Sequence, residues 1–235
     1  LLIGDSATWG FLLPPDQTTA AILNQSAPIL PDGRKIRAYN LGYPVMSLTK
    51  DLLILSRAMA YKPDLIVWAV TLESFPYDKQ LFPPLLQNNA GEVRGLIEQY
   101  DLNLNPESPD LIDQDFWNRT IIGSRRHLAD LIRLQLYGIM WAATGIDQEL
   151  PEIYSPPHQC LATELTFHNL QPPHLEDTAI AVDVLQAGFD LAGEVPVLLV
   201  NEPMLVSQGD NSDIRYNFFY PRWAYDDYRQ LLTQM

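Results

Sequence analysis

The sequence predicts an α/β domain with a doubly wound parallel sheet and a large, mostly helical insertion after the third strand. Short apolar runs alternate along the chain with amphipathic helical segments, in the order β-α-β-α-β. This order favours a parallel sheet with right-handed crossovers. The chain has 235 residues, of which 47% are hydrophobic and 19% charged, and this suits one large domain with a substantial core.

Short apolar runs predict the strands, at residues 1–3, 35–41, 65–71 and 195–200. The run at 65–71 is nearly continuous, as expected for a central strand covered on both faces. The first run is shorter than the usual strand of about five or six residues. Because the chain also stops inside a helical pattern, we expect residues 1–235 to be a single domain truncated at both ends.

Helical periodicity predicts the helices around this sheet, at residues 18–24, 47–61, 178–192 and from about Arg222 onwards. Asp16 is a suitable N-cap for the first of these helices. In the second helix one stripe is apolar, formed by Leu48, Leu52, Leu55 and Met59.

Residues 75–175 are far more than a crossover between two parallel strands needs. They contain a clear helix at 125–143 with an apolar stripe, formed by Leu128, Leu131, Ile132, Leu136, Ile139, Met140 and Ala143. We interpret this insertion as a cap over the carboxyl edge of the sheet. An insertion that packs away from the site is the alternative. The uncharged stretch at 134–146 is too short to span a bilayer.

The formal net charge of −14 argues against nucleic acid as a partner and disfavours docking on anionic lipid. The single cysteine, Cys160, excludes an internal disulfide and a cysteine-based zinc site. No two histidines have metal-ligand spacing, and no glycine-rich phosphate loop follows the first strand. We therefore expect no metal and no cofactor, and a nucleotide- or flavin-binding protein is a poor interpretation.

The ends of the predicted strands carry the candidate functional residues, because sites in open α/β sheets form at the carboxyl edge. Gly4-Asp5-Ser6 follows the first strand and presents the Ser6 hydroxyl to the crevice, beside free backbone N–H groups. Asp5 is expected to hold this turn through local hydrogen bonds. Gly42 ends the second strand. The other strand ends carry the candidate substrate-binding residues Thr71, Glu73, Ser74, Asn201 and Glu202.

Residues 2–10, together with Tyr39-Asn40-Leu41-Gly42, resemble the first two sequence blocks of the GDSL-type (SGNH) hydrolases. The resemblance implies a flavodoxin-like sheet, Ser6 as the nucleophile, and the backbone N–H groups of Ser6 and Gly42 as oxyanion donors. It also implies hydrolysis or transfer of acyl esters of lipids or carbohydrates. A bacterial extracytoplasmic or membrane-anchored location would fit, with membrane contact only through an anchor upstream of this chain.

Two departures from the family pattern matter. The third block, Gly-x-Asn-Asp, is replaced by Thr71-Leu72-Glu73-Ser74, so the donor asparagine is missing; Ser74 or Asn201 could replace it. An ionised Glu73 would oppose an oxyanion unless it points elsewhere. The final Asp-x-x-His block is absent, and we expect it beyond Met235, since each histidine present is expected in a surface loop. A non-catalytic binding or assembly protein with a degenerate fold is the alternative.

Overall fold

The computed structural model describes residues 1–113, 116–117, 120–145, 166–176, 178–202 and 221–234. It is a mixed α/β structure around a small parallel sheet with the strand order β1-β2-β3. The strands are β1 (Leu2–Ile3), β2 (Ile66–Val70) and β3 (Val197–Asn201). Leu2 pairs with Val67, and Ile66 pairs with Val197. The strand predictions at 1–3, 65–71 and 195–200 are confirmed.

The predicted strand at 35–41 is only partly present. Its end pairs with β1 through a parallel bridge between Leu2 and Asn40, and Leu41 N donates to Leu2 O at 2.8 Å. Its beginning pairs instead with the chain just before it, since Ile29 and Lys35 form an antiparallel bridge. Because β1 is only two residues long, it offers too few partners to hold residues 35–41 as one regular strand.

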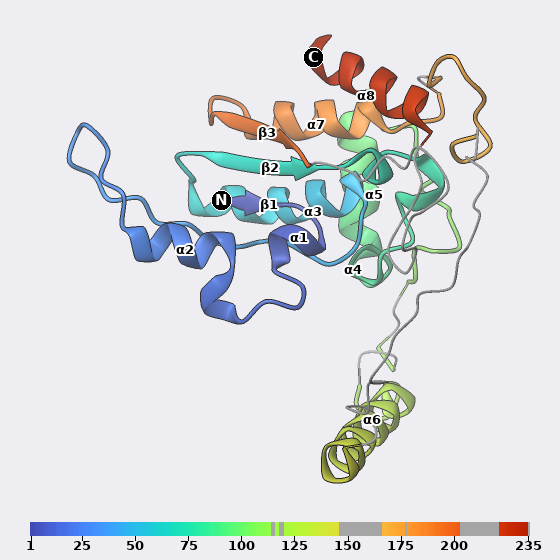
Figure 1. Ribbon diagram of the computed structural model, residues 1–235. Coiled ribbons are helices and arrows are strands. Elements are labelled where there is room, and N and C mark those ends of the chain that lie inside the picture. Colours follow the sequence, from blue (N-terminus) through green and yellow to red (C-terminus); the bar gives the residue numbers. More distant parts are fainter. Residues whose placement is uncertain (114–115, 118–119, 146–165, 177, 203–220, 235) are drawn as a thin grey trace, which may run out of the picture.

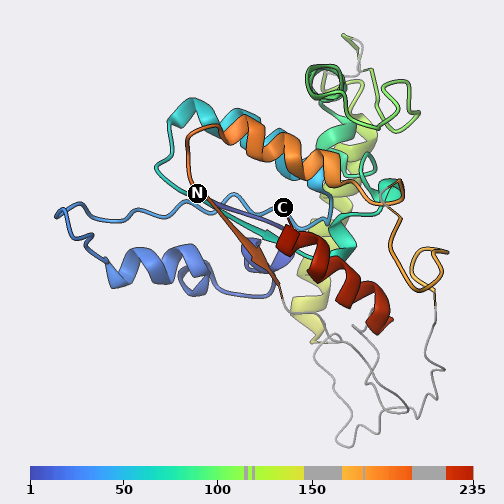
Figure 2. The same cartoon turned by 90° about the horizontal axis from the view of Figure 1, so that it is seen from above.

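Helices lie on both faces of the sheet, and side chains alternate between the two faces along each strand. Ile66, Trp68 and Val70 are buried in one large core with α3 (Leu48–Ala58) and α7 (Val182–Ala192). On the other face, Leu2 and Val67 pack with Ala20 of α2 (Thr19–Ser26). Figure 2 shows α3 and α7 side by side on one face of the sheet and α2 on the other.

The helix predictions are confirmed, with shifted ends. The N-cap of α2 is Thr18, whose hydroxyl accepts from Ala21 N, whereas Asp16 lies in the preceding 3-10 helix η1 (Pro15–Gln17). Helix α3 continues into the 3-10 helix η2 (Met59–Tyr61). Helix α7 begins at residue 182 rather than 178, because Ala181 N donates to Phe75 O instead of starting the helix. Helix α8 (Arg222–Gln234) ends the described chain.

The predicted insertion has two parts with different environments. The 3-10 helix η3 (Leu72–Ser74) precedes it, and its first part contains η4 (Tyr77–Lys79), α4 (Pro84–Gln87) and α5 (Ala90–Tyr100). Leu86, Val93 and Ile97 from this part are buried in the same core as the sheet. The second part is α6 (Arg125–Thr144), which contains no buried residue.

Figure 1 shows α6 set apart from the sheet and from the other helices. Within the described chain the apolar stripe of α6 packs against none of the strands, and the interpretation of the whole insertion as a cap stays a prediction. His158 and Cys160 lie outside the described residues. Within the part of the chain that is described, no helix is both long and apolar enough to cross a membrane.

Candidate functional site at the carboxyl edge of the sheet

The turn after β1 presents Ser6 as the first residue of the short helix α1 (Ser6–Trp9). Asp5 is the N-cap of this helix, and its Oδ1 accepts from Ala7 N at 2.9 Å, as the sequence predicts. Gly10 ends the helix in the left-handed conformation and donates its N–H to Ser6 O. Ser6 is half-buried, and within the described chain neither its hydroxyl nor its N–H has a hydrogen-bond partner. Both groups are therefore available to a ligand.

Gly42 lies directly against the backbone of α1. A Cβ atom at this position would lie 2.3 Å from Trp9 N and 2.8 Å from Thr8 C, so only glycine permits this approach. Asn40 holds the contact, because its Nδ2 donates to Trp9 O at 3.2 Å and its Oδ1 accepts from Gly42 N at 2.9 Å. The N–H that the family resemblance assigns to the oxyanion thus has a partner, and a substrate oxygen would have to replace it.

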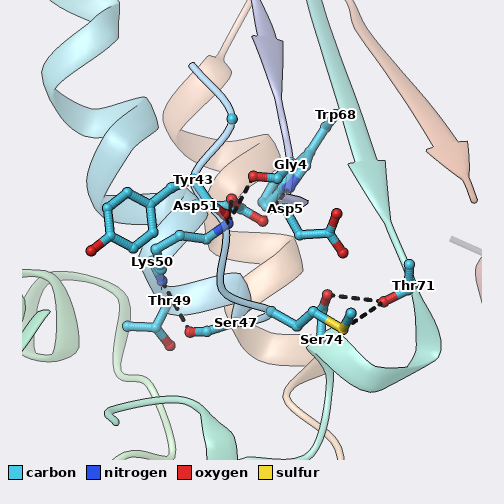
Figure 3. Close-up of polar contacts among 12 residues, drawn as sticks. Gly4, Asp5, Tyr43, Ser47, Thr49, Lys50, Asp51, Trp68, Thr71 and Ser74 are labelled. Atoms are coloured by element: carbon cyan, nitrogen blue, oxygen red, sulfur yellow. Dashed lines mark hydrogen bonds and ion pairs between the residues drawn. The ribbon is translucent and has the colours of Figure 1, made fainter. Parts of the chain in front are cut away.

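A fully buried ion pair lies behind the turn. The Lys50 ammonium donates to Gly4 O at 2.9 Å and to Tyr43 O at 3.4 Å. It also lies 2.6 Å from Asp51 Oδ1, and Asp51 Oδ2 accepts from the Trp68 indole N–H at 3.1 Å. Burial raises the pKa of Asp51, and Lys50 opposes this shift. Figure 3 shows Lys50 reaching from α3 to Gly4, next to Tyr43.

Lys50 therefore links the chain before Ser6 to the chain after Gly42. The sequence patterns did not predict Lys50, Asp51 or Asn40 as residues of the site. One signal was present, because Asp51 stands three residues after Leu48 and so falls within the apolar stripe of its helix. A carboxylate in such a stripe requires a buried cationic partner.

The segment after β2 is buried, and its polar groups bond to one another. Thr71 Oγ1 and Ser74 Oγ lie 3.3 Å apart, and the Thr71 hydroxyl faces Met46 Sδ at 3.8 Å (Figure 3). The Glu73 carboxylate forms an ion pair with Lys79 and a hydrogen bond with His168 Nε2 at 3.1 Å. The charge of Glu73 is thus balanced within its own segment.

His168 also lies 3.3 Å from Asp78 through Nδ1, so it belongs to a cluster of charged side chains rather than to a solvated loop. The other described histidine beside a carboxylate is His174, whose Nδ1 lies 3.1 Å from Asp227 Oδ1 and whose side chain is mostly exposed. Within the described residues, no histidine forms a hydrogen bond with Ser6.

Gln80 fixes this segment to the start of α3. Its buried Oε1 accepts from the N–H and the hydroxyl of Thr49, both at 3.0 Å. Its Nε2 donates to Ser74 O at 2.8 Å and to Pro76 O at 3.0 Å. The amide of Gln80 is fully satisfied, and a satisfied buried network of this kind makes the edge of the site rigid.

The end of β3 adds Asn201 and Glu202. The Asn201 Nδ2 donates to the Tyr225 hydroxyl at 3.4 Å, while its buried Oδ1 has no partner within the described part of the chain. Burial raises the pKa of Glu202 to about 7, with further contributions from the negative charges of Asp5 and Asp51. Asp5 and Glu202, which follow different strands, thus interact at one edge of the sheet.

An open cavity of about 520 Å³ lies beside α1. Its lining is mostly apolar and comprises Trp9, Gly10, Phe11, Leu12, Leu13, Pro15, Thr18 and Asn40. The rings of Trp9 and Phe11 stack at 6.3 Å between centroids, and both are about half exposed. An apolar surface therefore begins one helical turn from Ser6.

Among the described residues, no three histidine, cysteine, aspartate or glutamate side chains lie close enough together to hold a metal ion. No protein-family model, no curated protein and no solved structure matches this chain. The resemblance to the SGNH hydrolases therefore depends on the motif residues and on where they lie in the fold.

Proposed function

We propose that this protein hydrolyses or transfers acyl ester groups with Ser6 as the nucleophile, on a doubly wound sheet of the SGNH-hydrolase type. The observation that supports this most is the setting of Ser6. It follows the first strand, it begins a helix that Asp5 caps, and its hydroxyl and N–H are both unoccupied within the described chain.

In this proposal the Ser6 hydroxyl attacks the acyl carbonyl, and a base takes its proton. The carbonyl oxygen becomes an oxyanion that accepts from Ser6 N–H, and from Gly42 N–H once Asn40 releases it. The base returns the proton to the alcohol that leaves, and an acyl-serine remains. Water or a second alcohol then takes the acyl group from Ser6. The family pattern assigns the base to the histidine of an Asp-x-x-His block.

The surroundings of Ser6 indicate the kind of ester. The cavity beside α1 offers apolar and aromatic surface to an acyl chain or to the flat face of a sugar ring. The net charge of −14 disfavours strongly anionic substrates. Lipid esters and acylated carbohydrates fit both observations.

A serine-directed fluorophosphonate probe on the full-length protein tests this function. We expect the probe to label the wild-type protein and not the S6A variant. S26A is the matched control, because Ser26 is an exposed serine whose hydroxyl bonds only to Leu23 O among the described residues, and it should label like the wild type. Labelling that survives in S6A would refute the proposal.

A non-catalytic binding protein is the second candidate. Two contacts favour it: Asn40 occupies the N–H of Gly42, and Glu73 with its ion pair and hydrogen bond stands where the family has a donor asparagine. A folded full-length protein that the probe never labels would support this candidate over the enzyme.

A further inference from the structure

Helix α6 is the largest unpartnered apolar element in the described chain. It has 20 residues and none of them is buried. Its large apolar side chains are between 45% exposed (Leu128) and 66% exposed (Ile139). Four large apolar side chains that precede the helix in the sequence are also exposed, namely Phe116, Trp117, Ile121 and Ile122. So much contiguous apolar surface marks an interaction site.

Polar and apolar side chains lie on different faces of α6. Arg126, Asp130, Arg133 and Tyr137 recur at intervals of three or four residues and form one narrow polar face. The stripe predicted from the sequence lies opposite, and Leu134 and Trp141 widen it. Tyr137 and Trp141 stack with their ring centroids 6.5 Å apart, beside the polar face. A broad apolar face with arginines and aromatic rings at its border is typical of helices that lie in a membrane interface.

Charge distinguishes a lipid surface from a second copy of the chain. The helix carries three arginines against one aspartate, whereas the whole chain has a net charge of −14. Two copies that met through α6 would bring two helices of net positive charge together. Because α6 projects away from the body (Figure 1), a lipid surface would contact this basic helix before it contacts the acidic body. The negative charges of the body that lie further from the lipid than the Debye length of about 8 Å are largely screened.

We propose that α6 and the loop before it lie in the interface of an anionic lipid membrane, with the stripe of Ile132 and Ile139 in the acyl region and the arginines at the headgroups. From the sequence we expect membrane contact only through a segment upstream, because the net charge of −14 disfavours docking on anionic lipid. This surface would hold the protein at a membrane independently of such a segment and of the chemistry at Ser6.

Vesicle flotation tests this proposal, with phosphatidylcholine vesicles with and without phosphatidylglycerol. We expect the wild type to float with the anionic vesicles and the I132E/I139E variant to bind at least about tenfold more weakly. R125E/R126E should lose the preference for anionic lipid. The matched control is I22E/I29E, which places the same two substitutions at exposed isoleucines elsewhere and should float like the wild type.

Circular dichroism and thermal unfolding will show that the variants keep the fold, which is expected because the substituted side chains are exposed. Three results would overturn the proposal. The wild type could fail to float with either vesicle, or I132E/I139E could float as well as the wild type. The wild type could also form a dimer that I132E/I139E abolishes without any binding to vesicles, which would assign the surface to a second copy.

Discussion

Substitution of Lys50 by methionine probes the buried ion pair that links the two sides of the site. Methionine keeps most of the volume of lysine but leaves Asp51 without its cation, and the carbonyls of Gly4 and Tyr43 without a donor. Removing one partner of a fully buried pair costs about 3–5 kcal/mol. We therefore expect K50M to lower the free energy of unfolding by that amount in urea or guanidinium titrations.

The double variant K50M/D51N shows how much of the lost stability of K50M comes from the unpaired negative charge of Asp51. Asparagine carries no charge and can still accept from the Trp68 indole, so the double variant should regain about 2 kcal/mol relative to K50M. The pH dependence has a definite sign. Burial already raises the pKa of Asp51, and loss of Lys50 raises it further, so the deficit of K50M should shrink as the pH falls and Asp51 gains a proton. This reasoning would be refuted if K50M lowered the free energy of unfolding by less than about 1 kcal/mol, or if the double variant regained none of the lost stability.

Two further predictions concern other parts of the site. G42A should lower the free energy of unfolding by about 1–3 kcal/mol and weaken fluorophosphonate labelling, because its Cβ would clash with the backbone at Trp9. The control G91A, whose Cβ would contact nothing, should leave the free energy of unfolding unchanged or raise it by up to about 1 kcal/mol. Equal unfolding midpoints for the two variants would contradict this. Burial raises the pKa of Glu202 from 4.5 to about 7, so the folded state holds this proton more tightly and the wild type loses stability as the pH rises through 7. Relative to the wild type, E202Q should gain about 1–2 kcal/mol between pH 5 and pH 8, after allowance for solvent screening of a half-exposed group; a constant difference would exclude this titration.

The sequence alone determined the elements whose signal is local. The stripe from Leu48 to Met59 predicted α3, the apolar run at 65–71 predicted β2, and the Gly4-Asp5-Ser6 turn predicted the local hydrogen bond of Asp5. In each case residues a few positions apart define the element, so its pattern is present before the chain folds.

Contacts between distant segments decided the rest. No local pattern shows that Lys50 reaches Gly4, that Gly42 touches the backbone of Trp9, or that Glu73 pairs with His168, since each contact joins residues that lie dozens of positions apart. The exposure of α6 is of the same kind. An amphipathic stripe indicates that a helix needs an apolar partner, but only the tertiary structure shows whether the protein itself provides one.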